Sequence, residues 1–201
     1  MKNILIIGAT GTLGTATTQT ALKETDDHLT LFARSANRIN ITNPQRETVI
    51  SGDVLNDHDL DKALEGQEAV FAALSGNLSA YAKKIVAAMD RNNVSRLVFI
   101  SSMGIYNEIP ASVGASGNLE SNPILQSYRD AADIVEASDL NYTVVRPGWF
   151  TSGPVDYEIT HKGEPFGGHD VSVKSIADLV TKLLNDENLY SRESIGINMP
   201  N

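Results

Sequence analysis

The sequence near the start of the chain reads Ile4-Leu5-Ile6-Ile7-Gly8-Ala9-Thr10-Gly11-Thr12-Leu13-Gly14. Its first four residues are apolar and mostly β-branched, which is typical of a parallel strand that is buried on both faces. Three glycines with the spacing GxxGxxG then predict a tight turn. Apolar residues recur at helical spacing from Leu13 to Leu22, so a helix is expected directly after the turn.

Each glycine has a separate physical task in such a turn. Gly8 permits the sharp turn off the strand, Gly11 lets the backbone approach a phosphate, and Gly14 lets the helix pack close to the sheet. A pyrophosphate then binds at the helix N-terminus, where free amides and the helix dipole favour an anion. Glycine triplets also occur in ordinary turns, but the strand before this one and the helix after it favour dinucleotide binding. The predicted cofactor contacts here are Gly8, Thr10, Gly11, Thr12, Leu13 and Gly14.

Composition excludes several classes of function. The 201 residues suffice for one α/β domain, and the net charge of −9 argues against a nucleic acid partner. There is no cysteine, and the four histidines lack metal-ligand spacing, so neither disulfides nor a metal site is expected. No apolar run approaches membrane-spanning length, and the chain enters its first strand without a signal segment. We therefore expect a cytoplasmic monomer or homodimer that acts on a small molecule.

The second predicted strand, His28 to Ala33, ends at Arg34-Ser35. In dinucleotide folds an acidic residue at this point binds the ribose 2′-hydroxyl of NAD, whereas an arginine meets the 2′-phosphate of NADP. A guanidinium suits phosphate because its planar fork donates two parallel charge-assisted bonds, and Arg38 would add a second charge. The alternative is a solvated surface arginine. Because Arg34 occurs together with the glycine turn, the sequence predicts that NADP(H) is preferred over NAD(H).

The form GATGTLG resembles the short-chain dehydrogenase/reductase superfamily, in its extended and atypical branches. The resemblance implies that Asp53 and Val54, which follow a third strand at Thr48 to Ser51, contact the adenine ring. The other interpretation is that Asp53 caps a helix beginning near Asp57. A fourth strand, Ala69 to Leu74, ends in small residues that allow a cofactor to pass close to the backbone. Predicted contacts here are Ala73, Leu74 and Ser75.

A fifth strand, Arg96 to Ser102, is followed by an irregular stretch, Ile105 to Asn118, whose length predicts a lid or disorder. A helix carrying Tyr128 then runs to about Ala137, with Ser121 or Asn122 as its cap and Pro123 in its first turn.

The remainder of the chain begins with a sixth strand, Tyr142 to Val145. Residues 149–169 are predicted to be an irregular substrate-side segment with one short strand, Tyr157 to His161. A helix capped by Ser172 and a strand from Ile195 to Met199 complete the chain. The predicted fold is a single α/β domain over residues 1–201, a Rossmann-type doubly wound parallel sheet with helices on both faces.

Taken together, the chain resembles an atypical short-chain dehydrogenase/reductase of the NAD(P)H-binding (NmrA-like) group, to which biliverdin reductase B-like flavin reductases also belong. The markers are GATGTLG, Arg34, Gly52-Asp53-Val54, Ser101-Ser102 and Arg146-Pro147-Gly148. The resemblance implies further cofactor contacts at Pro147 and Gly148.

The chain departs from that superfamily in its catalytic pair. The usual pair is YxxxK, in which the lysine lowers the tyrosine pKa so that the phenol passes a proton to a carbonyl. Here no lysine occurs between Lys84 and Lys162, and Ala132 stands four residues after Tyr128. The ordinary carbonyl-reductase mechanism is therefore not expected.

Two functions remain. One is an NADPH-dependent reductase of a small conjugated acceptor such as a quinone or flavin, which needs little acid catalysis. Ser102 would then stabilise the developing oxyanion, and Tyr128 would supply a proton or line the pocket. Four residues either stack on the substrate or pack in the core: Met103, Tyr106, Trp149 and Phe150. The alternative is an NADP(H)-binding sensor without turnover, which the missing lysine favours.

Overall fold

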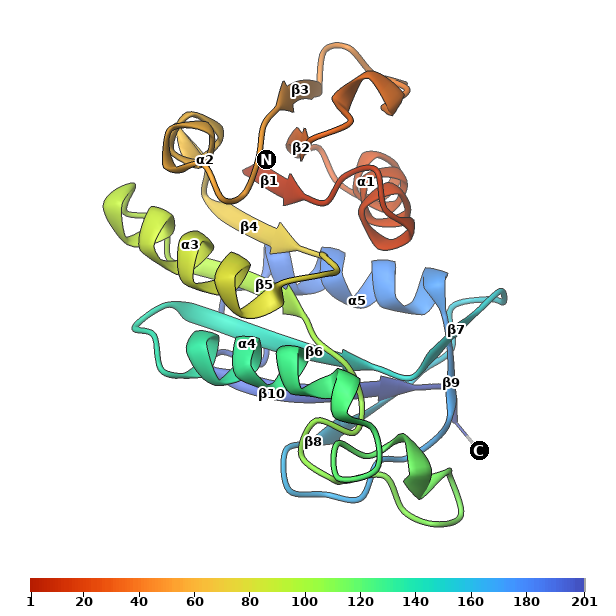
Figure 1. The fold of residues 1–201 in the computed structure, drawn as a ribbon. Coiled ribbons are helices and arrows are strands. Elements are labelled where there is room, and N and C mark those ends of the chain that lie inside the picture. Colours follow the sequence, from red (N-terminus) through yellow and green to blue (C-terminus); the bar gives the residue numbers. More distant parts are fainter. Residues whose placement is uncertain (201) are drawn as a thin grey trace.

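The computed structural model describes residues 1–200, and a central sheet of eight strands forms its middle layer (Figure 1). In sheet order the strands are β3 (Glu47–Ser51), β2 (His28–Ala33), β1 (Asn3–Ile7), β4 (Ala69–Ala72), β5 (Arg96–Ile100), β6 (Asn141–Pro147), β10 (Glu193–Asn198) and β8 (Glu158–His161). All neighbours are parallel except β8, which runs antiparallel to β10. After β1 the chain adds β2 and β3 on one side of it, and then β4, β5 and β6 on the other side. The direction in which strands are added therefore reverses at β1.

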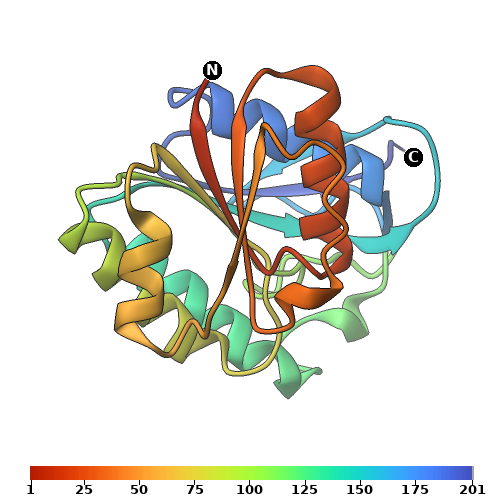
Figure 2. The ribbon, with the colours of Figure 1, turned by 90° about the horizontal axis from the view of Figure 1, so that it is seen from above.

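Helices cover both faces of this sheet (Figure 2). One face carries α1 (Thr12–Glu24) and α5 (Val173–Asn185), and the other carries α2 (Asp57–Leu64), α3 (Leu78–Arg91) and α4 (Gln126–Glu136). Side chains of β1 alternate between the two layers, since Leu5 packs with α2, α3 and α4 while Ile6 packs with α1 and α5. Burial on both faces explains the unbroken apolar run, and the predicted Rossmann-type fold is confirmed.

Two small features extend the substrate side of the sheet. A separate parallel pair, β7 (Trp149–Thr151) and β9 (Asp170–Ser172), lies at the carboxyl end of β6. The sequence did not predict this pair, because each strand has only three residues. The predicted strand Tyr157 to His161 is present as β8. Within residues 1–200, no helix is both long enough and apolar enough to cross a membrane.

The helix caps only partly follow the predictions. The Ser172 hydroxyl accepts a bond from the Ser175 amide at 3.0 Å, so the predicted cap of α5 is confirmed. In contrast, α2 is capped by Asn56, whose side-chain oxygen accepts from the amides of His58 and Asp59. The interpretation of Asp53 as this cap is therefore wrong. A 3₁₀ turn, Pro123–Leu125, precedes α4, and Asn122 makes no side-chain cap bond there.

The stretch from Ile105 to Asn118 is ordered. Asn118 is buried, and its amide side chain both accepts from the Ile109 N–H and donates to the Ile109 carbonyl, each at 2.9 Å. These paired bonds close the loop on itself.

We expect the chain to unfold in one cooperative transition. The two helical layers share the strands of a single sheet, so neither layer keeps its core when the other is lost. Thermal denaturation followed by circular dichroism and by tryptophan fluorescence should give coincident curves. Two separated transitions in the cofactor-free protein would contradict a single-domain organisation.

Candidate cofactor and substrate site

The glycine turn brings three elements into backbone contact. Gly8 has a φ of +87°, and a Cβ there would lie 2.1 Å from the Ala73 carbonyl oxygen at the end of β4. A Cβ on Gly14 would lie 2.3 Å from the Gly8 carbonyl oxygen. Both positions therefore require glycine, one for its conformation and close approach, the other for the packing of α1 on β1.

The N-terminus of α1 is open to an anion. Gly11 caps the helix without a side-chain bond, and no acidic residue lies in the first turn. Gly11 and Thr12 are exposed there, whereas Leu13 and Gly14 are buried beneath the turn. Backbone amides at such a helix start bind phosphate well, because the helix dipole adds partial positive charge.

A cleft of about 240 Å³ opens beside this turn, across the carboxyl ends of β1 to β4. Predicted cofactor residues that line it are Gly8, Thr10, Arg34, Ser35, Asp53, Val54, Leu74 and Ser75. Other residues of the lining are Ile7, Phe32, Ala33, Arg38, Gly52 and Tyr81. The cleft lies where the strand order reverses, which is the usual ligand position in open parallel sheets.

Charge in the cleft is opposite in sign to that of the whole protein. Arg34 and Arg38 are both exposed at its rim, although the chain carries a net charge of −9. Asp53 also lines the cleft, and its Oδ1 accepts the Leu55 N–H at 3.0 Å. The two arginines supply a local field for an anionic group at the end of β2.

The remaining predicted cofactor residues continue along the same edge of the sheet. Ala73 lies against the glycine turn, and Pro147 and Gly148 are buried at the end of β6. The Met103 N–H donates to the Pro147 carbonyl at 3.2 Å, so the segment after β5 lies beside the end of β6. The carboxyl edge thus leads from the cleft at β1 to β4 toward β5 and β6 (Figure 1).

Ser102 and Tyr128 lie on neighbouring segments of this edge. The Ser102 hydroxyl is half-buried and donates to the Met103 carbonyl at 3.0 Å. Ser101, directly before it, donates through its hydroxyl to the Tyr128 carbonyl at 3.3 Å, which ties α4 to the end of β5. Tyr128 itself is half-buried and packs against the core of the α3–α4 layer.

Two tyrosines contact lysines, but not as a catalytic pair. Lys162 Nζ lies 4.4 Å from the centre of the Tyr106 ring, and Lys182 donates to the Tyr157 hydroxyl at 3.2 Å. Burial raises the pKa of Tyr106, and its bond to Glu136 raises it further. Burial likewise raises the pKa of Tyr157. A catalytic tyrosine needs the opposite shift, so neither contact replaces the missing YxxxK pair.

The four predicted pocket residues divide into two pairs. Met103 is buried with Ile109 and Phe166, and Tyr106 packs against the core with Arg146 over its ring at 5.1 Å. Both side chains therefore pack against core residues, as the second alternative expects.

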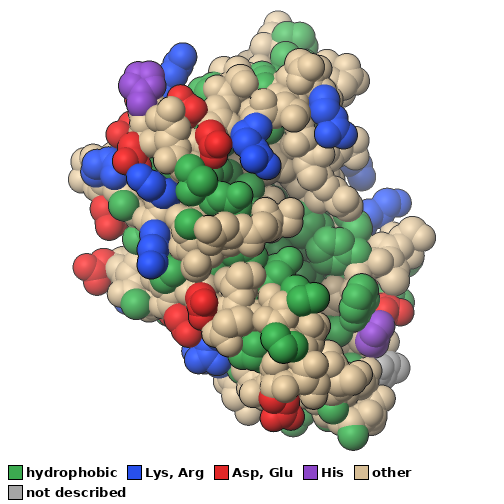
Figure 3. Space-filling model, viewed as in Figure 1, with side chains coloured by type: hydrophobic (Ala, Val, Ile, Leu, Met, Phe, Trp, Pro, Cys, Tyr) green, Lys and Arg blue, Asp and Glu red, His purple; other side chains and the backbone are tan. Residues whose placement is uncertain are grey.

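The other pair reaches the surface. Trp149 is 64% exposed and Phe150 is 47% exposed. Both belong to β7, at the carboxyl edge of the sheet. Hydrophobic side chains are visible at the surface in a depression on the face of the molecule seen in Figure 3.

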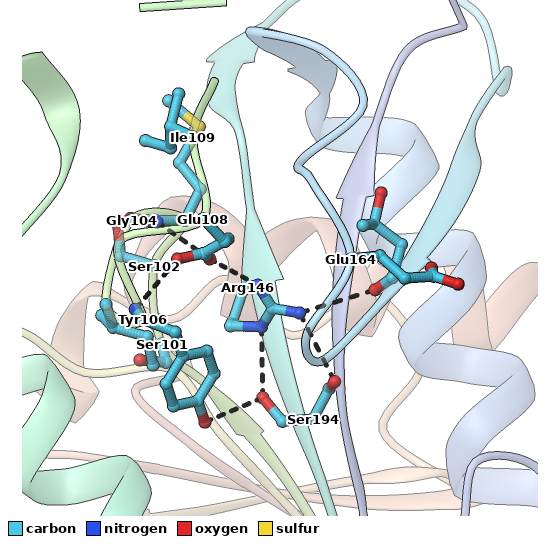
Figure 4. Close-up of polar contacts among 12 residues, drawn as sticks. Ser101, Ser102, Gly104, Tyr106, Glu108, Ile109, Arg146, Glu164 and Ser194 are labelled. Atoms are coloured by element: carbon cyan, nitrogen blue, oxygen red, sulfur yellow. Dashed lines mark hydrogen bonds and ion pairs between the residues drawn. The ribbon is translucent and has the colours of Figure 1, made fainter. Parts of the chain in front are cut away.

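A buried ion pair holds the segment after β5 in place (Figure 4). The Glu108 carboxylate pairs with Arg146, and the two side chains are 5% and 0% exposed. Glu108 also accepts the N–H groups of Gly104 at 3.0 Å and Tyr106 at 2.9 Å. Arg146 in turn donates from Nε to the Ser194 hydroxyl at 3.2 Å.

Sequence reasoning missed this pair. Its only local signal is an arginine that ends the apolar run Tyr142 to Val145. The pair joins the loop to β6 and β10, and Glu108 holds the residues that follow Met103 through the Gly104 and Tyr106 N–H groups.

Comparison with known proteins agrees with this geometry. The family model described as NAD(P)H-binding matches residues 8–187. The chain belongs to this NAD(P)H-binding family. It is 32% identical to a short-chain dehydrogenase/reductase from Veillonella parvula, with a TM-score of 0.91 over 99% of this chain and 94% of that one. The resemblance to an atypical short-chain dehydrogenase/reductase group is thereby confirmed.

Two further solved structures are similar. A Rossmann-fold NAD(P)-binding family protein from Shigella flexneri is 38% identical, with a TM-score of 0.86 over 100% of this chain and 94% of that one. Another short-chain dehydrogenase/reductase from Veillonella parvula, solved in complex with NADP, is 30% identical, with a TM-score of 0.90 over 99% and 95% of the two chains. The fold of this family member is oxidoreductase-like.

Replacing Gly14 should test the close packing of the turn. We expect Gly14→Ala to lower the free energy of unfolding by about 1–3 kcal/mol, because its methyl group would overlap the Gly8 carbonyl. That loss outweighs the gain of about 1 kcal/mol that alanine brings to a helix. Urea denaturation measures it. The control is Gly153→Ala, whose new methyl meets only Ser172 Cβ at 3.5 Å, and a comparable loss there would contradict the argument.

Proposed function

We propose that this protein is an NADPH-dependent reductase that transfers a hydride to a small conjugated acceptor such as a quinone or a flavin. The observation that supports it most is the cleft, where Arg34 and Arg38 stand at the end of β2 beside the open start of α1. A 2′-phosphate would pair with these arginines, while the pyrophosphate would bind the amides of the glycine turn.

The class of acceptor follows from the residues at the carboxyl edge of the sheet, which lack a tyrosine–lysine acid pair. When bound, the reduced nicotinamide supplies a hydride. A conjugated acceptor delocalises the charge it gains, so it requires little help from an acid, and holding the rings in register is the main task of the protein. Ser102 would turn its hydroxyl from the Met103 carbonyl to the acceptor oxygen, where it stabilises negative charge.

The second candidate is an NADP(H)-binding sensor that does not turn over. It is favoured by the missing lysine after Tyr128 and by the raised pKa values of the two tyrosines that do contact lysines. NADPH oxidation with a panel of quinones and flavins separates the two functions. Sustained turnover supports the reductase, whereas tight NADPH binding without turnover supports the sensor.

Arg34 should determine the preference for NADPH over NADH. We expect Arg34→Ala to weaken NADPH binding at least about tenfold, since a lost charge-assisted phosphate bond costs roughly 1.5–3 kcal/mol. NADH affinity should hardly change. Isothermal titration of both cofactors measures this, with Arg91→Ala as the control because Arg91 lies on α3 and pairs with Asp61. Equal affinities for the two cofactors in the wild type would refute the assignment.

Catalysis should depend more on Ser102 than on Tyr128. Losing an oxyanion donor costs roughly 10²–10³ in kcat in a dry site, and we expect about tenfold here because the Ser102 hydroxyl is only half-buried. Tyr128→Phe should change kcat by only a few-fold, because no lysine supports its proton transfer. Steady-state kinetics with menadione, together with NADPH titrations, separate chemistry from binding. An inactive Tyr128→Phe variant that still binds NADPH would favour a tyrosine acid instead.

A further inference from the structure

One histidine stands on the substrate side of the carboxyl edge with its own carboxylate partner. His169 Nδ1 lies 2.6 Å from Asp170 Oδ1. His169 directly precedes β9, and Asp170 is the first residue of that strand. The imidazole ring is stacked on the indole of Trp149, with the planes at 10° and the ring centres 6.0 Å apart. The His169 side chain is 53% exposed, so it is open to a ligand and to solvent.

The backbone of His169 is joined to the end of β6. Trp149 donates its N–H to the His169 carbonyl at 2.8 Å, and a Cβ on Gly148 would lie 2.5 Å from the same oxygen. The preceding residue, Pro147, accepts the Met103 N–H. His169 is thus connected through two short backbone contacts to the segment that carries Ser102.

The loop after β5 also comes close to His169. A Cβ on Gly114 would lie 4.0 Å from His169 Cδ2. The buried ion pair between Glu108 and Arg146 anchors the start of this loop to the core. The part of the loop near His169 therefore belongs to an anchored segment.

The contacts of the ring indicate its chemistry. A carboxylate at Nδ1 accepts a bond from that nitrogen, which leaves Nε2 as the position that gains or loses a proton. Asp170 is the titratable group that the described residues place against His169, since β7 contributes the uncharged Trp149 and the loop contributes Gly114.

We propose that His169, oriented by Asp170, is the proton donor to the acceptor, and that Trp149 is the platform on which a flat quinone rests. The inference depends on the proposed reductase function. In the step, the quinone takes a hydride from NADPH, which becomes NADP⁺, and a proton from Nε2 of the imidazolium. The N–H bond breaks as an O–H bond forms on the product hydroquinone, and solvent returns a proton to His169.

Fluorescence tests the contact without any turnover. Trp149 is the single tryptophan of the chain, so the intrinsic emission reports on this site alone. Protonated imidazole quenches a neighbouring indole, and we expect emission of the NADP⁺ complex to rise in a single step as the pH rises and the ring loses its proton. The step should be absent in His169→Gln. It should persist in the control His58→Gln, since His58 also stands beside an aspartate but belongs to α2.

Kinetics with menadione test the proton transfer. In the wild type, kcat should fall as pH rises through the range in which histidine loses its proton. His169→Gln should lower kcat at pH 6 by about tenfold, at the low end for a general acid because the acceptor delocalises charge, and should remove this pH dependence. Asp170→Asn should also lower kcat, since it removes the carboxylate that orients the imidazole ring through Nδ1. The dissociation constant of NADPH should stay within about twofold in both variants.

The outcomes separate the inference from the function beneath it. A His169→Gln variant with the wild-type kcat and pH profile would overturn the role of His169 and leave the reductase intact. A fluorescence step that survives in His169→Gln would overturn the contact itself. A wild-type protein that oxidises no NADPH with menadione or a flavin at any pH would instead refute the proposed reductase, and the inference with it.

Discussion

The first turn of the chain lies so close to its neighbours that a side chain is excluded at two of its positions, Gly8 and Gly14. The Gly8 carbonyl occupies the space of a Cβ on Gly14, and the Ala73 carbonyl occupies the space of a Cβ on Gly8. Contact through the backbone alone therefore joins α1, β1 and the end of β4. The same contact leaves the start of α1 without a side-chain cap, beside the cleft. Anion binding and helix packing are consequences of one constraint.

The other half of the carboxyl edge depends on a buried ion pair. Arg146 ends an apolar strand, and burying its charge is unfavourable unless a partner and further hydrogen bonds compensate for the lost water. Glu108 supplies the partner, and Ser194 accepts a further hydrogen bond from Arg146. The buried Glu108 carboxylate in turn accepts two backbone N–H groups. The long loop after β5 is thereby held to the sheet. One residue of this loop, Gly114, lies near His169.

Local charge and global charge have different roles in this molecule. The net charge of −9 repels polyanions at long range, yet two arginines at the end of β2 present positive charge to a small anion in the cleft. Proton chemistry shows a similar division. The buried tyrosines that contact lysines hold their protons more tightly, because burial and neighbouring carboxylates oppose the phenolate. The His169 and Asp170 side chains form an exposed pair that solvent reaches.

The sequence by itself determined the fold class and predicted many of the residues that line the cleft. An apolar run, a glycine turn and helical periodicity are local signals, and they place Gly8, Arg34 and Asp53 at strand ends that a parallel sheet gathers at one edge. Short elements such as β7 and β9 escaped prediction because three residues carry too little periodicity. Only the tertiary structure decided that Met103 and Tyr106 belong to the core while Trp149 is exposed. It alone paired Glu108 with Arg146 and brought His169 to Trp149, because these contacts join residues distant in sequence and depend on packing that no local pattern records.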